Sequence, residues 1–116
     1  MKIVTLHSNT WGCGVAKFNY EVGKRLGWEV IGYRQWVNNP KLEVILSISF
    51  TEFSLKDWQL LEDIIAKEKV DFHLIIHSLT VNYAPSIFEK AKTITALNDE
   101  IFEGLKLIGY ESNKGY

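Results

Sequence analysis

Short apolar segments alternate along this chain with segments whose apolar residues recur at helical spacing. The apolar segments predict strands at residues 3–6, 28–33, 42–49, 71–77 and 93–97. The helical spacing predicts helices at residues 15–26, 55–68, 85–91 and 99–108. Apolar strands joined by helices of crossover length predict one α/β domain. We expect a Rossmann-like three-layer α/β/α sandwich with a mostly parallel sheet of about five strands.

Start and stop signals flank several of these helices. Asn98 is a predicted N-cap, and so is Ser54, which has Asp57 at the reaching-back position of a capping box. Gly27 and Gly109 are placed to end the first and last helices in a left-handed conformation. The apolar stripe of the first helix consists of Val15, Phe18, Val22 and Leu26.

Two segments are predicted to be irregular. Residues 34–41 contain Asn-Asn-Pro and predict a loop, in which Trp36 either packs under the loop or serves as a surface anchor or ligand platform. The polar tail at residues 111–116 predicts a frayed terminus.

The composition of the chain argues against a nucleic-acid partner and for a reducing compartment. The chain has 116 residues and a formal net charge of −1, without a basic block, so a nucleic-acid partner is not expected. Cys13 is the only cysteine, which rules out an internal disulfide and fits a reducing compartment. No signal peptide precedes the first strand, and no apolar run reaches about 18 residues. We therefore expect a cytoplasmic protein without a transmembrane segment.

A polar, glycine-containing loop separates the first strand from the first helix. Gly12 and Gly14 would let backbone N–H groups approach a ligand at the helix N-terminus, with Asn9 and Thr10 beside them. Lys17 stands where the third glycine of G-x-G-x-x-G would be, and no G-K-[ST] follows. The alternative is a tight turn that packs the first strand against the first helix.

The carboxyl ends of parallel strands are where α/β sheets bind ligands. His77 and Ser78 follow the fourth predicted strand, Asn98 follows the fifth, and His7 ends the first. If these strands are neighbours, their side chains converge on one crevice. His77 is a candidate acid, base or hydrogen-bonding group, and the alternative is a histidine satisfied by backbone carbonyls. His73, inside the same strand, is interpreted as structural.

Other chemistry has weaker support in the sequence. The three histidines and Cys13 lack the spacing of metal ligands, so no metal site is predicted. A nucleophilic Cys13 would need a base beside it, which the sequence does not place. Ser8 and Ser78 lack a nucleophile elbow and are interpreted as loop or ligand-binding hydroxyls.

Three segments resemble one enzyme family, in the order in which that family carries them. GCGVAKFNYEVGKRLGWEV resembles a G-G-V-A loop, a helix and an L-x-x-x-G-H-E-V segment. DFHLIIHS is similar to a D-V-V-H-x-H-S strand, and AKTITALNDEIFEGLKLIG to an A-D-x-V-I-A-L-S segment that ends in L-x-x-x-G. Across nearly its whole length, the chain thus resembles the N-terminal domain of GT-B glycosyltransferases of the retaining family 4.

The resemblance implies a Rossmann-like domain that receives a sugar or lipid acceptor. It places Gly12 and Gly14 near the acceptor and the donor phosphates, and His77 beside the reaction centre. Asn98 stands where the family usually has serine. The nucleotide-sugar donor would be a substrate, held mainly by a second domain, and no cofactor is implied.

The departures from the family pattern limit what the chain would do alone. Cys13 separates glycines that are usually adjacent, and Trp28 stands where histidine is common. The family's C-terminal donor-binding domain is missing, so we expect no turnover without that domain or a donor-binding partner chain. Two alternatives remain: a stand-alone module for a nucleotide or phosphorylated ligand, and a homo-oligomeric interaction protein that uses Trp11, Trp36 and the sheet edge.

Overall fold

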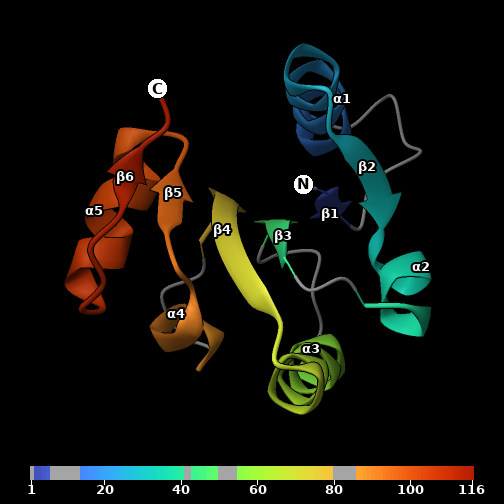
Figure 1. Ribbon diagram of the computed structural model, residues 1–116. Helices are drawn as coiled ribbons and strands as arrows, with labels where there is room; N and C mark the ends of the chain where they lie inside the picture. The colour runs from blue at the N-terminus through green and yellow to red at the C-terminus, as the bar shows by residue number, and fades with distance from the viewer. Residues whose placement is uncertain (1, 6–13, 41–42, 50–54, 80–85) are drawn as a thin grey trace.

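One sheet of six parallel strands forms the centre of the molecule (Figure 1). The computed structural model describes residues 2–5, 14–40, 43–49, 55–79 and 86–116. The strands are β1 (Lys2–Thr5), β2 (Glu29–Gly32), β3 (Glu43–Ser49), β4 (Asp71–Ser78), β5 (Ile94–Ala96) and β6 (Asn113–Lys114). The described helices are α1 (Gly14–Leu26), α2 (Tyr33–Asn38), α3 (Leu55–Glu68), α4 (Ile87–Lys90) and α5 (Asp99–Leu107). The predicted Rossmann-like three-layer α/β fold is confirmed.

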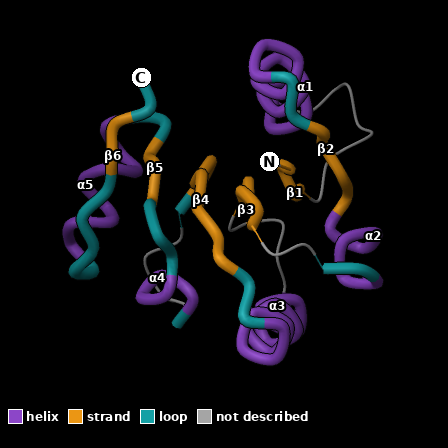
Figure 2. Tube along the Cα trace, in the orientation of Figure 1, coloured by secondary structure: helices purple, strands orange, loops and turns teal. Residues whose placement is uncertain are grey.

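The strand order in the sheet is β2-β1-β3-β4-β5-β6 (Figure 2). The chain first moves outward from β1 to β2, then returns to the other side of β1 and continues in one direction to β6. The order therefore reverses between β1 and β3. In doubly wound sheets of this kind, ligands bind outside the carboxyl ends of the strands near such a reversal.

Most of the hydrophobic core lies on one face of the sheet. Val4, Leu46 and Leu74 are register partners on adjacent strands, and all three are buried. The same core contains side chains from every described helix except α1, so α2, α3, α4 and α5 pack on this face. The helical members are Tyr33, Trp36, Trp58, Leu61, Ile65, Ile87, Phe88, Ile101 and Leu105.

The opposite face is covered by α1, which lies across the sheet from α3 (Figure 1). α1 contacts β1, β2 and β3, and beneath it the register partners Ile3 and Ile45 are buried. Farther along this face, over β4 and β5, the side chains are only half-buried: His73, Ile75, Thr95 and Leu97. Among the described helices, α1 is thus the only cover of this second face.

The predicted loop at residues 34–41 was wrong, because Tyr33–Asn38 form α2. Tyr33 and Trp36 are three residues apart, so one helical turn places both on the same side. Both are buried in the core, at 5% and 0% exposure. Burial of two large aromatic side chains outweighs the loop signal of the Asn-Asn-Pro segment, whose first residue, Asn38, ends the helix.

The predicted frayed tail was also wrong, because Asn113–Lys114 form β6 and bring the strand count to six. The amide of Gly115 donates to the carbonyl of Ala96 at 2.8 Å, which holds the tail against β5. A polar two-residue strand has no apolar pattern and therefore gives no sequence signal.

Several predicted boundaries are confirmed and others move inward. Gly27 and Gly109 follow α1 and α5 with φ of 69° and 95°, the left-handed conformation expected of helix-ending glycines. β2, β5 and α4, the helix predicted at residues 85–91, are shorter than predicted. The predicted cap Ser54 lies outside the described residues.

Candidate functional site

The structure describes part of the predicted site. His77 and Ser78 are the last residues of β4, and Asn98 precedes α5 at the carboxyl end of β5. Gly14 is the first residue of α1. The remaining predicted residues, Asn9, Thr10 and Gly12, lie outside the described residues, as do His7, Ser8, Trp11 and Cys13.

The predicted convergence of three strand ends is confirmed for only two of them. β4 and β5 are neighbours, whereas β3 lies between β1 and β4. As a result, Ser47 and Ser49 of β3 stand beside His77 and Ser78, and both serines are buried. The prediction missed these serines, although two serines at the carboxyl end of an apolar strand were a readable signal.

A chain of hydrogen bonds links α1, β3 and β4. The hydroxyl of Ser47 donates to Oδ1 of Asn19 at 2.7 Å. The same Oγ lies 2.6 Å from Nε2 of His77. Ser47 is 1% exposed and Asn19 is 0% exposed, so the hydrogen bond between them is shielded from water, whereas the contact with the half-buried His77 is only partly shielded. Nδ2 of Asn19 is buried and has no hydrogen-bond partner among the described residues.

Two further contacts fix the surroundings of His77. The Phe18 ring of α1 meets the imidazole edge to face, with centroids 5.0 Å apart and an interplanar angle of 81°. Next to it, the hydroxyls of Ser49 and Ser78 are 2.6 Å apart. The His77 ring is therefore held by an aromatic contact from one element and a hydrogen bond from another.

A pocket of about 200 Å³ opens at the carboxyl ends of β4 and β5. It combines hydrogen-bonding side chains with apolar ones, and its lining residues are His77, Ser78, Leu79, Asn98, Glu100, Ile101 and Gly104. Its volume is below the roughly 300–1,000 Å³ of pockets that hold drug-sized ligands. The pocket thus has room for a small group rather than for a whole nucleotide sugar.

The N-terminus of α5 at this pocket is capped by a side chain and carries two acidic residues. Oδ1 of Asn98 accepts a hydrogen bond from the amide of Ile101 at 2.9 Å, which confirms the predicted N-cap. Asp99 and Glu100 occupy the first turn, where their carboxylates complement the helix dipole. These two carboxylates would repel the phosphate group of a ligand, whereas they would not repel a neutral hydroxyl group.

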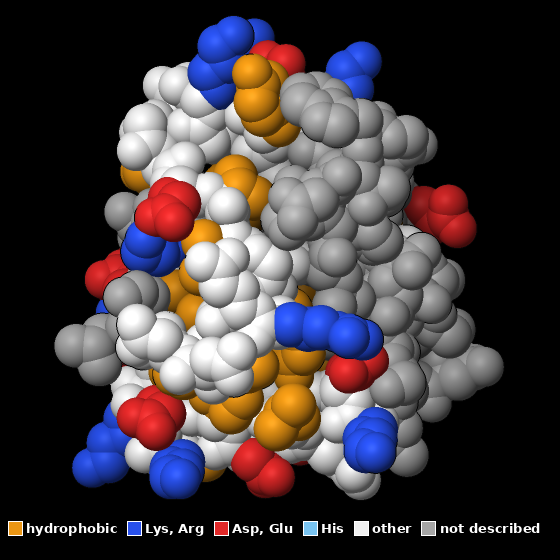
Figure 3. Space-filling model, turned by 90° about the vertical axis from the view of Figure 1, so that its right-hand side faces the viewer, with side chains coloured by type: hydrophobic (Ala, Val, Ile, Leu, Met, Phe, Trp, Pro, Cys, Tyr) orange, Lys and Arg blue, Asp and Glu red, His pale blue; other side chains and the backbone are white. Residues whose placement is uncertain are grey.

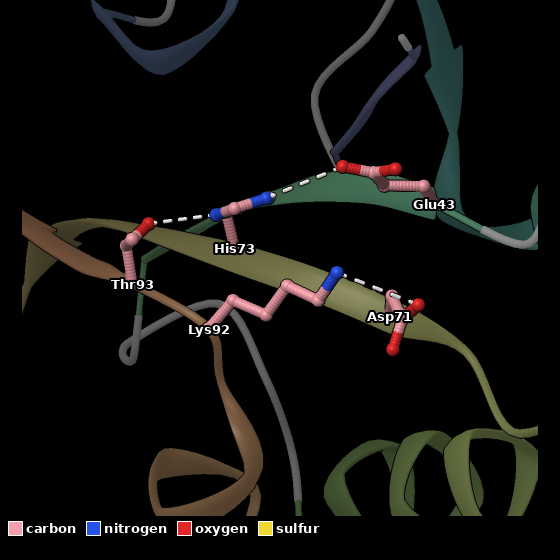
Figure 4. A network of polar contacts seen from close by, with 5 residues as sticks. All are labelled: Glu43, Asp71, His73, Lys92 and Thr93. Atoms are coloured by element: carbon pink, nitrogen blue, oxygen red, sulfur yellow. Dashed lines mark hydrogen bonds and ion pairs between the residues drawn. The ribbon is translucent and has the colours of Figure 1, made fainter.

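His73 lies in a separate polar cluster away from the carboxyl end (Figure 4). Its Nδ1 is 2.8 Å from Oγ1 of Thr93, and its Nε2 is 3.6 Å from Oε1 of Glu43. Beside it, Nζ of Lys92 lies 3.5 Å from Oδ2 of Asp71. These contacts tie β3, β4 and the start of β5 together, as the structural interpretation of His73 predicts.

No three His, Cys, Asp or Glu side chains of the described residues come close enough together to hold a metal ion. None of the helices in that part of the chain is long and apolar enough to span a membrane. On the side that carries β2 and α2, basic and acidic side chains are interspersed with small hydrophobic areas (Figure 3). Trp36, one predicted interaction residue, is fully buried, so it is neither a ligand platform nor a surface anchor.

Comparisons with known protein families, curated proteins and solved structures find no match to this chain.

Proposed function

We propose that this chain is the acceptor-binding side of a glycosyltransferase, with the acceptor hydroxyl bound in the pocket between β4 and α5. The sugar would come from a nucleotide-sugar donor held mainly by a second domain or partner chain. The described pocket supplies the acceptor side only, so the chain alone would not turn over. The proposal includes a cytoplasmic location, which rests on the sequence.

The observation that carries this proposal is the placement of His77 in the pocket with its ring held from two directions. Ser47 holds the ring through Nε2, and Phe18 packs against it. A fixed imidazole orients a hydroxyl nucleophile and exchanges a proton with it. The likeness of this strand to the family's D-V-V-H-x-H-S segment supports the same role for His77.

The pocket's charge and size favour a sugar-like group over a phosphorylated one. Glu100 lines the pocket and Asp99 lies next to it in the chain, so the phosphate groups of a nucleotide would meet negative charge. Carboxylate, amide and hydroxyl groups instead hydrogen-bond to sugar hydroxyls, while Leu79 and Ile101 provide apolar surface for a ring face. These features favour the hypothesis of an acceptor-binding domain over that of a stand-alone nucleotide-binding module.

The proposal is tested by titrating the isotope-labelled chain with glucose, mannose and N-acetylglucosamine, and separately with UDP and GDP, in amide NMR spectra. We expect at least one saccharide to bind in the millimolar range and to shift the amides of Ser78, Ile101 and Gly104. His77→Ala should fold and lose this binding. His73→Ala, changed on the same strand outside the pocket, is the matched control and should retain it.

Absence of saccharide binding would contradict the proposal, and so would two further results. One is tighter binding of UDP or GDP than of every saccharide at these same amides, which would indicate a nucleotide module. The other is an equal loss of stability and binding in both histidine variants, which would make His77 structural.

A further inference from the structure

An asparagine with no solvent exposure stands in the middle of α1, where an apolar residue would pack without cost. Its amide nitrogen, Nδ2, has no hydrogen-bond partner among the described residues. Leaving a buried donor unpaired is unfavourable, so such a group calls for an explanation. The hydrogen bond that Asn19 accepts through Oδ1 comes from Ser47, which in turn contacts His77.

The protons in this chain of contacts can be assigned from chemistry. Ser47 has one hydroxyl proton, and it is donated to Oδ1 of Asn19. At 2.6 Å from Nε2 of His77, the serine oxygen must then act as the acceptor. The neutral imidazole therefore carries its proton on Nε2, and Nδ1 holds the basic lone pair.

We infer that Ser47 and Asn19 are positioning residues that fix His77 as its Nε2–H tautomer. A proton taken up by the ring is then bound at Nδ1, and the proton on Nε2 stays on that nitrogen, donated to Oγ of Ser47. This inference rests on the proposed function for its purpose, because a fixed tautomer matters where His77 meets an acceptor hydroxyl. The geometry from which it is drawn does not involve a ligand.

Removing the Asn19 side chain should move the proton of the neutral His77 ring from Nε2 to Nδ1. Without Oδ1 as its acceptor, the Ser47 hydroxyl turns to Nε2 of His77, which is 2.6 Å from it. The ring then places its own proton on Nδ1. A merely structural asparagine would leave the tautomer unchanged, so the tautomer separates the two roles.

The test is a long-range ¹H–¹⁵N correlation spectrum of the imidazole nitrogens in the labelled chain. It is recorded at about pH 8, above the reference histidine pKa of roughly 6.5. The three histidine signals are assigned with His77→Gln and His73→Gln. We expect the Nε2–H pattern for His77 in the unchanged chain, a measurement that needs no destabilising substitution.

Variants then test whether Ser47 and Asn19 determine the tautomer of His77. Asn19→Leu should move His77 toward the Nδ1–H pattern, and Ser47→Ala should lower the fraction of the Nε2–H form. Ser47→Thr keeps the hydroxyl and should restore the pattern of the unchanged chain. Ser49→Ala, two residues along the same strand, is the matched control and should change nothing. The His73 signals should stay constant in all four variants.

The Nδ1–H form in the unchanged chain, or an unaltered Nε2–H form in both Asn19→Leu and Ser47→Ala, would overturn the inference. The proposed function fails differently. If the chain shows the expected tautomers but binds no saccharide, the positioning role of Ser47 and Asn19 stands and the proposed acceptor binding is contradicted.

Discussion

Oγ of Ser47 lies 2.6 Å from Nε2 of His77, although the two residues belong to different strands and are 30 positions apart in the chain. Parallel pairing of β3 with β4 brings them together, because their carboxyl ends meet at one edge of the sheet. The contact joins a buried hydroxyl to a half-buried imidazole at the edge of the candidate pocket. Its energetic weight is open to direct measurement.

Ser47→Ala should lower the free energy of unfolding by about 1–3 kcal/mol, because it leaves Oδ1 of Asn19 buried without its donor. Ser49→Ala should have a smaller effect, since its partner Ser78 is half-buried and gains water as a substitute. Urea denaturation of the two variants and the unchanged chain provides the comparison. Equal destabilisation by the two substitutions would mean that leaving Oδ1 of Asn19 without a donor does not lower stability further.

Asn98→Ala should lower the free energy of unfolding by about 1 kcal/mol, because the cap hydrogen bond to the amide of Ile101 is lost. Asn98→Ser should retain most of that stability, since a serine hydroxyl caps as well. The pair separates the capping role from ligand contact in saccharide titrations. Loss of binding in Asn98→Ser at unchanged stability would assign the amide group itself to the ligand.

Gly23→Ala should destabilise the fold by about 1–3 kcal/mol through overpacking. A Cβ at this position would lie 2.9 Å from the carbonyl oxygen of Trp28, which belongs to the backbone, and 3.0 Å from Cγ2 of Val30. α1 would have to move away from β2. Thermal or urea unfolding measures the effect, and Lys24→Ala on the exposed side of the same helix should stay within about 0.5 kcal/mol. A neutral Gly23→Ala would show that the helix shifts freely.

Tyr33 should make the stability of the fold sensitive to alkaline pH. Burial, with a smaller contribution from the Asp57 carboxylate, raises the pKa of Tyr33 from 10.0 to about 12. The folded state thus favours the neutral phenol. Its contribution is complete below the unfolded pKa of about 10 and is lost as the pH rises through the folded pKa of about 12.

Tyr33→Phe tests this pH dependence. It removes the 3.3 Å hydrogen bond to the carbonyl of Asp57, and stability at pH 7 should change by less than about 1 kcal/mol. Above about pH 10 the variant should lose less stability than the unchanged chain. Denaturation midpoints at both pH values give the answer, and parallel curves for the two proteins would refute the assignment to Tyr33.

Residues with a strong local signal gave correct sequence predictions. The apolar run at Val44–Ile48 and the stripe with Trp58, Leu61 and Ile65 form a strand and a helix because their burial pattern is local and periodic. Asn98 caps α5 as its residue type indicates. Such features depend on neighbours within a few positions, which the sequence shows directly.

Features that depend on distant neighbours were not predictable in this way. Asn19 looks like a solvated residue of an amphipathic helix, and its burial follows from packing against Ser47 on β3. Ser47 becomes a partner of His77 because β3 is inserted between β1 and β4, and no local pattern specifies strand order. β6 likewise depends on β5, to which the polar tail is bound by backbone hydrogen bonds.

The position of β1 between β2 and β3 has a consequence for the kinetics of folding. Both ladders of β1, with β2 and with β3, are parallel, so neither can form as a hairpin. Each requires closure of a long loop before any inter-strand bond offsets the lost chain entropy. We expect the barrier to folding to be dominated by this closure, with refolding slower than in helical bundles of similar length. Stopped-flow refolding would measure that rate.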